Sequence, residues 1–331
     1  MNRMKNRHLV LAALLGLLAV SGARAIAQSP ASASAAPITP PSSTLSSLFG
    51  RYAISGDFGV KDPKEWGGTT TWVAADGKGT VLVMVRVAPY LRFFTTEGAP
   101  IRQWGDKDLF TGEAHSAHFG PDGSVWATDS VDHTVRKFSP TGQLLLTLGK
   151  QKVAGDNASQ EAFNRPNAVA FGANGNIFVS DGYANQRVVE FTPDGKFVRI
   201  FGGKKGKGDG EMAMVHGVAI DAQGRVYATD SDNQRVLVFD AQGKFLKNIA
   251  IPGRGGSFMA SDGTFYISDV NSGAVAVLKN DQIVDVIKVE GRPHGLAVDP
   301  TTGDVYTSST VATRPGVTKA TARKGTGNAT N

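Results

Sequence analysis

The sequence contains no cysteine and only six histidines, and beyond its N-terminus it contains no long apolar run. The absence of cysteine excludes disulfide bonds, thiolate metal ligands and cysteine nucleophiles. The absence of an apolar run of about 18 residues means that no membrane span is predicted. With 331 residues, of which 41% are hydrophobic, the chain is long enough to be stabilised by its core alone.

The first residues have the pattern of a secretory signal peptide. A short basic start, MNRMKNRH, precedes the apolar run LVLAALLGLLAV, and small residues follow in ARAIA. This pattern predicts a signal peptide over residues 1–27, cleaved after Ala25 or Ala27, and therefore a secreted or periplasmic protein. Residues 28–49 are rich in Pro, Ser and Ala, which predicts a flexible leader.

The formal charge of +6 gives no support for a polyanionic partner. Four of the positive charges lie in the signal segment, and residues 312–331 form a basic tail that we expect to be disordered. Residues 50–311 are therefore close to neutral and carry no basic stripe, so nucleic acid is not an expected partner.

The remaining sequence is built from copies of one unit. Each copy has apolar runs of four to six residues separated by turn pairs such as DG, NG, QG and TG. Four short antiparallel strands in about forty to fifty residues are typical of a propeller blade. Six copies predict an all-β, six-bladed β-propeller over residues 50–311; they begin at Thr69, His115, Asn167, His216, Phe258 and His294.

The last copy lacks clear outer strands, so we expect the N-terminal segment LFGRYAISGDF to complete that blade. The units resemble NHL repeats in the run from a strand-opening residue through the Gly turn to an Asp-containing stretch. This resemblance covers roughly residues 65–310. It implies the fold and leaves the function open, because propellers host many activities.

Three histidines open the first strands of alternate units. HSAHFGPDG begins at His115, HGVAIDAQG at His216 and HGLAVDPTTG at His294. First strands line the central channel, and alternate blades of a six-fold ring are related by a pseudo-threefold axis. The three imidazoles should therefore converge at one mouth of the channel, as the protein ligands of a catalytic Zn²⁺ do. Asn167 occupies the same position and represents the alternative, a residue that only caps or packs.

Two further residues are expected at the same mouth, because second strands return to it. Arg86 ends VLVMVR in the first unit, and Tyr183 follows FVSDG in the third. Either is equally consistent with an ordinary residue of the rim. His118 and His133 lie outside the register of the three histidines, and we expect them to be ordinary surface or loop residues.

Residues that recur in nearly every unit are expected to serve the architecture. The aspartates of the Ser/Thr-Asp pairs should cap the next turn, and the recurring arginines should pack between blades and form ion pairs. They are Asp129, Asp181, Asp230 and Asp269, and Arg136, Arg187 and Arg235.

Several stretches resemble peptidyl-α-hydroxyglycine α-amidating lyase: LVMVR, HSAHFGPDGSVWATDSVDHTVRKFSP, FVSDGYANQRVVEFTPDGKF and HGVAIDAQGRVYATD. The resemblance implies His115, His216 and His294 as zinc ligands, with Tyr183 and Arg86 as catalytic residues. It implies cleavage of a peptidyl-α-hydroxyglycine, or a related α-hydroxy amide, to an amide and glyoxylate. Tyr183 would be the general base, and Arg86 would either lower its pKa or hold the substrate carboxylate.

The sequence departs from that family beside the third histidine. Gly295 follows it where the family has an acidic, calcium-contacting residue, and Arg292 stands two residues before it where the family has methionine. The sequence therefore predicts Zn²⁺ and does not predict Ca²⁺. A second hypothesis is a non-catalytic NHL propeller that binds a peptide, glycan or protein partner on its rim. A metal lactonase ranks last, because such enzymes use mainly carboxylate and Asn ligands.

Overall fold

The computed structural model describes residues 51–251, 256–259, 262–311, 313 and 315–323. In this part of the chain, strands β1 to β24 form six four-stranded antiparallel sheets. The predicted signal peptide and leader lie outside the described residues. No helix in the described part is long and apolar enough to cross a membrane.

Three sheets form the first half of the fold, and each follows the chain from its innermost strand outwards. Their strands are β2 (Thr70–Ala75), β3 (Thr80–Val85), β4 (Leu91–Thr95) and β5 (Pro100–Trp104); β6 (Ala114–Phe119), β7 (Val125–Asp129), β8 (Thr134–Phe138) and β9 (Leu144–Gly149); and β10 (Pro166–Phe171), β11 (Ile177–Asp181), β12 (Arg187–Phe191) and β13 (Phe197–Gly202).

The second half repeats this arrangement. Its strands are β14 (Val215–Ile220), β15 (Val226–Asp230), β16 (Arg235–Phe239) and β17 (Phe245–Ala250); β18 (Ser257–Met259), β19 (Phe265–Asp269), β20 (Ala274–Lys279) and β21 (Gln282–Lys288); and β22 (Pro293–Val298), β23 (Val305–Ser309), β24 (Gly316–Ala322) and β1 (Tyr52–Phe58). Two short 3-10 turns, η1 (Pro63–Trp66) and η2 (Ser231–Asn233), lie between strands.

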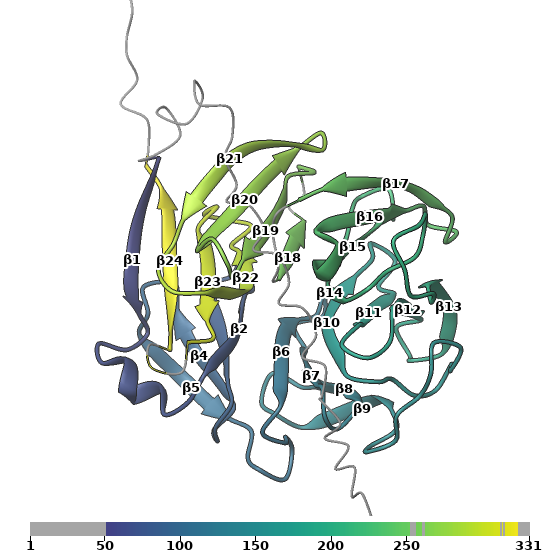
Figure 1. Ribbon diagram of the computed structural model, residues 1–331. Coiled ribbons are helices and arrows are strands. Elements are labelled where there is room, and N and C mark those ends of the chain that lie inside the picture. The colour runs from purple at the N-terminus through teal and green to yellow at the C-terminus, as the bar shows by residue number, and fades with distance from the viewer. Residues whose placement is uncertain (1–50, 252–255, 260–261, 312, 314, 324–331) are drawn as a thin grey trace, which may run out of the picture. The chain divides into compact units, whose positions relative to one another are not determined.

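The six innermost strands form a closed ring. β2, β6, β10, β14, β18 and β22 each contact the next in order, and β22 contacts β2. Figure 1 shows these strands around a central axis, with the outer strands radiating from it. The prediction of an all-β, six-bladed β-propeller is confirmed.

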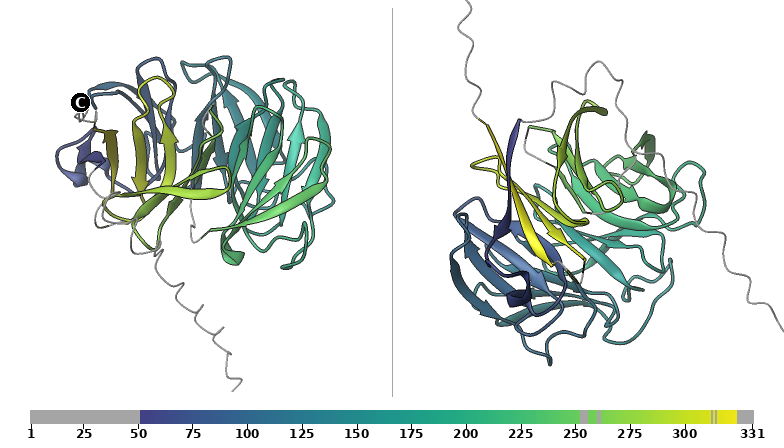
Figure 2. Two further views of the ribbon diagram at one scale, coloured as in Figure 1. Left: turned by 90° about the horizontal axis from the view of Figure 1, so that it is seen from above. Right: turned by 60° about the vertical axis from the view of Figure 1, so that its left-hand side comes forward.

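The ring closes as expected, because an N-terminal strand completes the sixth blade. β1 pairs antiparallel with β24. In Figure 2 the purple N-terminal strand lies beside the yellow C-terminal strands. One expectation is wrong here: Gly316–Ala322 lies in the predicted tail, 312–331, yet it forms β24. Its sequence, GVTKATA, has few large apolar residues, and it forms a strand because it pairs on both sides, with β23 and β1.

The core lies between neighbouring blades. Leu82 and Phe93 of the first blade pack with Ala127 and Phe138 of the second, and similar clusters join the other neighbours. Second strands such as β7 and β11 are buried along their whole length, whereas outer strands such as β5 are largely exposed. Burial between sheets therefore supplies the main stabilisation, as expected for a chain without disulfide bonds.

A β-bulge near the start of the innermost strand fixes the direction of one side chain in five of the six sheets. A bulge leaves a residue outside the regular ladder and turns its side chain, and bulges are common beside active sites. The residues at these bulges are Thr71, Asn167, His115, His216 and the pair His294–Gly295.

The Ser or Thr of the recurring Ser/Thr-Asp pair accepts a backbone hydrogen bond beside the bulge in the second, third and fourth blades. The hydroxyl of Thr128 accepts a hydrogen bond from the backbone N–H of Ser116 at 3.0 Å, and Thr229 does the same for Gly217 at 2.6 Å. Asp129 caps the following turn, as predicted, by accepting from the N–H of Asp132. Asp181 and Asp230 instead accept from the loop that enters their own blade. The motif therefore orients the residue that opens the first strand.

Candidate metal centre

The three histidines that the sequence places in one register meet at a single point. The nearest ring nitrogens of His115, His216 and His294 all lie within 4.8 Å of one another. They are 0%, 2% and 9% exposed, and they come from β6, β14 and β22, which belong to alternate blades. In the described part of the chain, this is the one group of three such side chains close enough to share an ion.

Backbone carbonyls of the next blade orient two of the rings. Nδ1 of His115 donates to the carbonyl oxygen of Asn167 at 2.7 Å, and Nδ1 of His294 donates to that of Thr71 at 2.8 Å. Burial, followed by the nearby His294 and His216, lowers the pKa of His115 well below its usual range, so this ring is neutral. With the proton on Nδ1, the lone pair of Nε2 points to the centre. Histidines that bind a metal through one ring nitrogen commonly donate the other ring N–H to a carbonyl in this way.

One pair of these nitrogens has the spacing of two ligands of a tetrahedral ion. Nε2 of His216 lies 3.1 Å from Nε2 of His294. A tetrahedral Zn²⁺ with metal–nitrogen bonds of about 2.0–2.1 Å separates its nitrogen ligands by about 3.3 Å. Three imidazoles are also a donor set that suits zinc and other imidazole-binding transition metals, and it leaves a fourth position for a substrate.

Tyr183 lies beside these nitrogens, on the loop after β11. Its hydroxyl donates to Nε2 of His115 at 2.9 Å and lies 3.3 Å from Nε2 of His216. Its ring packs edge-on against both imidazoles. The prediction placed Tyr183 at this mouth of the channel, and the structure brings its phenol oxygen within hydrogen-bond distance of two of the three histidines.

Arg86 lies near the centre but is engaged elsewhere. Its Nε donates to the carbonyl of Ala114 at 3.4 Å, and its Nη2 lies 3.6 Å from a carboxylate oxygen of Glu113. The guanidinium that covers the Tyr183 ring belongs to Arg165, whose central carbon is 5.5 Å from the ring centroid. Arg86 therefore sits next to His115, and the cation at Tyr183 is a residue that the sequence did not suggest.

Asn167 is a capping residue, which was the alternative interpretation of the position that the three histidines occupy. Its side-chain oxygen accepts a hydrogen bond from the backbone N–H of Gly182 at 3.0 Å, while its carbonyl orients His115. It therefore caps a loop and supports a ligand, and the three histidines of the centre come from the second, fourth and sixth blades. His133 lies in a loop, as expected.

A tryptophan closes the channel beneath the three histidines. Trp72 is 1% exposed, and its ring centroid lies 5.8 Å from that of His115, 6.5 Å from His216 and 6.0 Å from His294. It also contacts His118 at 5.2 Å. Because Trp72 contacts the three histidines and also His118, it separates the histidine centre from the channel below. This role could not be predicted from the sequence, since an apolar residue inside a strand is typical of ordinary core.

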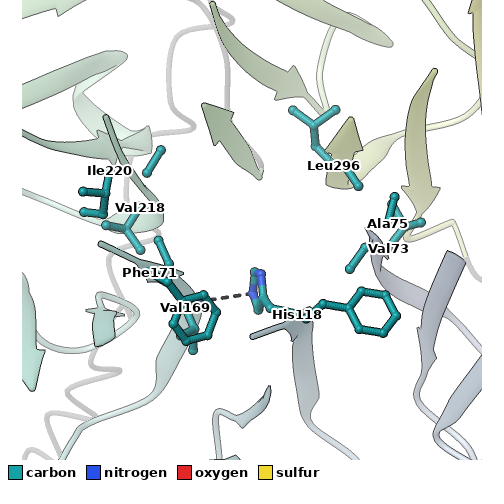
Figure 3. Close-up of a pocket in the computed structure, with 13 residues that line it drawn as sticks. Val73, Ala75, His118, Val169, Phe171, Val218, Ile220 and Leu296 are labelled. Atoms are coloured by element: carbon teal, nitrogen blue, oxygen red, sulfur yellow. Dashed lines mark hydrogen bonds between the residues drawn. The ribbon is translucent and has the colours of Figure 1, made fainter. Parts of the chain in front are cut away.

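Below Trp72, the channel is apolar. A cavity of about 210 Å³ is lined by side chains of the innermost strands, including Val73, Val169, Val218 and Leu296 (Figure 3). His118 is half-buried in this lining and accepts a hydrogen bond from the N–H of Val169 at 3.2 Å. The expectation that His118 is an ordinary surface or loop residue is therefore wrong.

The burial of His118 predicts a pH-dependent stability. Burial lowers the pKa of His118 to about 3. The pKa of His118 in the unfolded chain is about 6.5, and below this pH the unfolded chain binds a proton that the folded chain does not. The free energy of unfolding therefore decreases as the pH decreases, by up to about 1.4 kcal/mol per pH unit. Between pH 7 and 5, wild type should lose about 2 kcal/mol more unfolding free energy than His118→Gln. Urea unfolding of both proteins measures this; equal losses would contradict it.

The residues do not fit a calcium site next to the histidines. Gly295 carries no carboxylate, and among the described residues no acidic side chain lines the cavity below Trp72. A Cβ on Gly295 would lie 2.6 Å from Cα of Trp72 and 3.0 Å from the carbonyl oxygen of Thr71. The close approach of β2 therefore requires glycine at the position where the resembling family has an acid.

This contact predicts that Gly295→Ala is destabilising. The two nearest backbone atoms cannot move without shifting β2, and overpacking of this kind costs about 1–3 kcal/mol. The shift would also displace the Thr71 carbonyl that orients His294, so zinc affinity should fall. Urea unfolding and zinc titration measure both effects. Gly112→Ala is the matched control, because its Cβ would meet nothing within 4 Å; equal behaviour of the two variants would contradict the prediction.

Fold and site together define a class: a six-bladed β-propeller with three histidines converging on its axis. Residues 163–282 match a protein family described as a 6-bladed beta-propeller. The chain is distantly related to NHL-repeat proteins and to peptidyl-α-hydroxyglycine α-amidating lyases.

Two relatives show the extent of this similarity. Human NHL repeat-containing protein 3 is 29% identical over 275 residues, which cover 74% of this chain and 78% of that protein. A Caenorhabditis elegans protein, named as a probable peptidyl-α-hydroxyglycine α-amidating lyase, is 32% identical over 130 residues. That match covers 38% of this chain and 37% of the nematode protein.

The fold is also shared with enzymes of other activities. A gluconolactonase from Xanthomonas campestris superposes with a TM-score of 0.63 at 14% identity, covering 87% of this chain and 94% of that one. At this identity, the similarity concerns the fold alone. Distant sequence relatives and proteins of the same fold therefore include both lyases and lactonases.

Proposed function

We propose that this protein is an exported, zinc-dependent carbon–nitrogen lyase that cleaves a peptidyl-α-hydroxyglycine, or a related α-hydroxy amide, to an amide and glyoxylate. The observation that carries the proposal is the placement of the Tyr183 hydroxyl 2.9 and 3.3 Å from two of the three converging imidazole nitrogens. A lactonase is less well supported, because no carboxylate belongs to the group of potential ligands in the described residues.

The residues present suit this reaction. His115, His216 and His294 would hold the zinc ion, which acts when bound as a Lewis acid that lowers the pKa of an alcohol or water. Tyr183 takes the proton of the substrate hydroxyl in its phenolate form, because its oxygen is next to the place where that hydroxyl would bind. The carbon–oxygen double bond then forms, the carbon–nitrogen bond breaks, and the amide nitrogen receives the proton. Products are a primary amide and glyoxylate.

The surroundings favour a charge-separated transition state. Trp72 closes the site on the side of the channel, so the reacting groups meet water only at the mouth. Removing water from one side strengthens the electrostatic interactions inside the site. The oriented carbonyls of Asn167 and Thr71 keep two imidazoles fixed, so little reorganisation is needed during the reaction.

The direct test is an assay of glyoxylate. Purified zinc-loaded protein is incubated with an N-acyl-α-hydroxyglycine, and glyoxylate formation is compared with the chelator-treated protein and with free zinc. We expect turnover that requires both protein and metal. A zinc-loaded protein that produces glyoxylate no faster than free zinc would refute the lyase function for this substrate.

A second candidate is a propeller without catalytic activity that binds a peptide, glycan or protein partner on its rim. It is favoured by Gly295, which replaces the acidic residue of the resembling family. This candidate predicts that zinc remains bound while Tyr183→Phe and Arg86→Ala leave partner binding unchanged. The glyoxylate assay separates the two candidates.

A further inference from the structure

The cavity at the mouth of the histidine centre contains a guanidinium that none of the predicted roles uses. Arg292 lines a cavity of about 260 Å³ together with Tyr183, His216 and His294. Its Nε donates to the carbonyl of Val270 at 3.3 Å, which anchors the side chain. Within the described residues, Arg292 forms no ion pair, and the side chain is exposed to the cavity and to solvent. An anchored guanidinium without a carboxylate partner is suited to bind an anion.

Arg165 adds a second cation next to Tyr183. Its guanidinium covers the Tyr183 ring, and its carbonyl accepts a hydrogen bond from the N–H of Tyr183 at 3.4 Å. Its φ of 65° lies in the left-handed region, which costs about 1 kcal/mol or more for a residue with a side chain and is concentrated at functional sites. Within the described residues, its guanidinium also lacks an acidic partner.

Arg86 differs from both. Its guanidinium is shared between the carbonyl of Ala114 and the carboxylate of Glu113, and it does not line the cavity. An arginine whose charge is already balanced gains less from a substrate anion, because it must give up its partner.

We infer that Arg292, supported by Arg165, binds the carboxylate of the substrate and makes the site selective for α-hydroxy acids over uncharged α-hydroxy amides. This inference rests on the proposed function. In an α-hydroxyglycine, the carboxylate and the reacting hydroxyl share one carbon atom. With the hydroxyl beside Tyr183, the carboxylate must lie in the same cavity, where Arg292 presents a planar fork that matches it.

The experiment measures binding and does not depend on turnover. Glycolate carries a hydroxyl and a carboxylate on one carbon atom, as the substrate does, and glycolamide is its uncharged counterpart. Calorimetric titration of zinc-loaded wild type should detect glycolate. Arg292→Met should weaken glycolate binding about 10- to 100-fold, as expected for a lost charge-assisted contact, and should leave glycolamide binding and zinc content unchanged. Arg165→Met should give a smaller loss.

The matched control is Arg102→Met. Arg102 also stacks on an aromatic ring, that of Phe93, but it does not line the cavity with Tyr183. It should bind glycolate like wild type. Unchanged glycolate binding in Arg292→Met, an equal loss for glycolate and glycolamide, or no glycolate binding by wild type would each overturn the inference. Arg292-dependent glycolate binding without glyoxylate production from the full substrate would uphold the inference and refute the proposed function.

Discussion

Replacing Tyr183 by phenylalanine should lower kcat/KM for cleavage of an N-acyl-α-hydroxyglycine by about 10²- to 10⁴-fold, the usual contribution of a positioned general base. Only the hydroxyl is removed, and it lies 2.9 Å from Nε2 of His115 and 3.3 Å from Nε2 of His216. The phenyl ring keeps its edge-on contacts with both imidazoles. Zinc content and thermal stability should therefore remain at the wild-type level while turnover is lost.

The control for this variant is Tyr266→Phe. Tyr266 lies in β19, away from the histidines, and its loss of a hydroxyl should leave kcat/KM unchanged. Steady-state glyoxylate assays on metal-loaded wild type and both variants measure the kcat/KM values to be compared. If Tyr183→Phe kept more than half of the wild-type kcat/KM, Tyr183 would not be the base, and the proton would have to leave by another route.

Replacing Arg187 by methionine should lower the free energy of unfolding by about 3–5 kcal/mol, the cost of leaving a buried charge without its partner. Arg187 and Asp181 are both fully buried, and Nε of Arg187 lies 2.8 Å from Oδ2 of Asp181. Burial raises the pKa of Asp181, and Arg187 opposes this effect. Arg187 also donates to the carbonyl of Ala162, in the loop that joins the second and third blades.

Two further variants check the cause of this loss. Asp181→Asn combined with Arg187→Met removes both charges and should recover part of the stability, because the two residues share one interaction. Lys196→Met breaks the exposed pair with Asp194 and should leave the urea midpoint unchanged. An Arg187→Met protein as stable as wild type would show that the recurring Asp–Arg pairs do not hold the blades together.

The repeat pattern was sufficient to predict the fold and the central site. Turn pairs and four apolar runs per unit predict the blades. His115, His216 and His294 occupy the same position in alternate blades, and the symmetry of the ring brings such positions together near the axis. The loop position after β11 placed Tyr183 at the same mouth. These predictions hold because each depends on a rule that applies to every blade, and tertiary packing has little freedom to override it.

The features that sequence analysis missed belong to single blades. Trp72 stands where other units have the small residues Ser116, Ala168 and Gly217, and its place beneath the histidines follows from the geometry of the channel. Arg165 ends the connection between the second and third blades, outside the apolar runs that define the repeat. β24 has a weak strand sequence and forms because two neighbours pair with it. Such features depend on contacts between distant segments, which a periodic pattern does not contain.

The central claim is that the three histidines together hold one metal ion, and metal analysis after zinc loading and desalting tests it most directly. Wild type should retain about one zinc ion per chain, as a three-histidine site does. His216→Ala should retain almost none while keeping the fold, because the other two imidazoles alone bind zinc weakly. A wild-type protein that holds no zinc, or a His216→Ala protein that holds as much as wild type, would contradict the account.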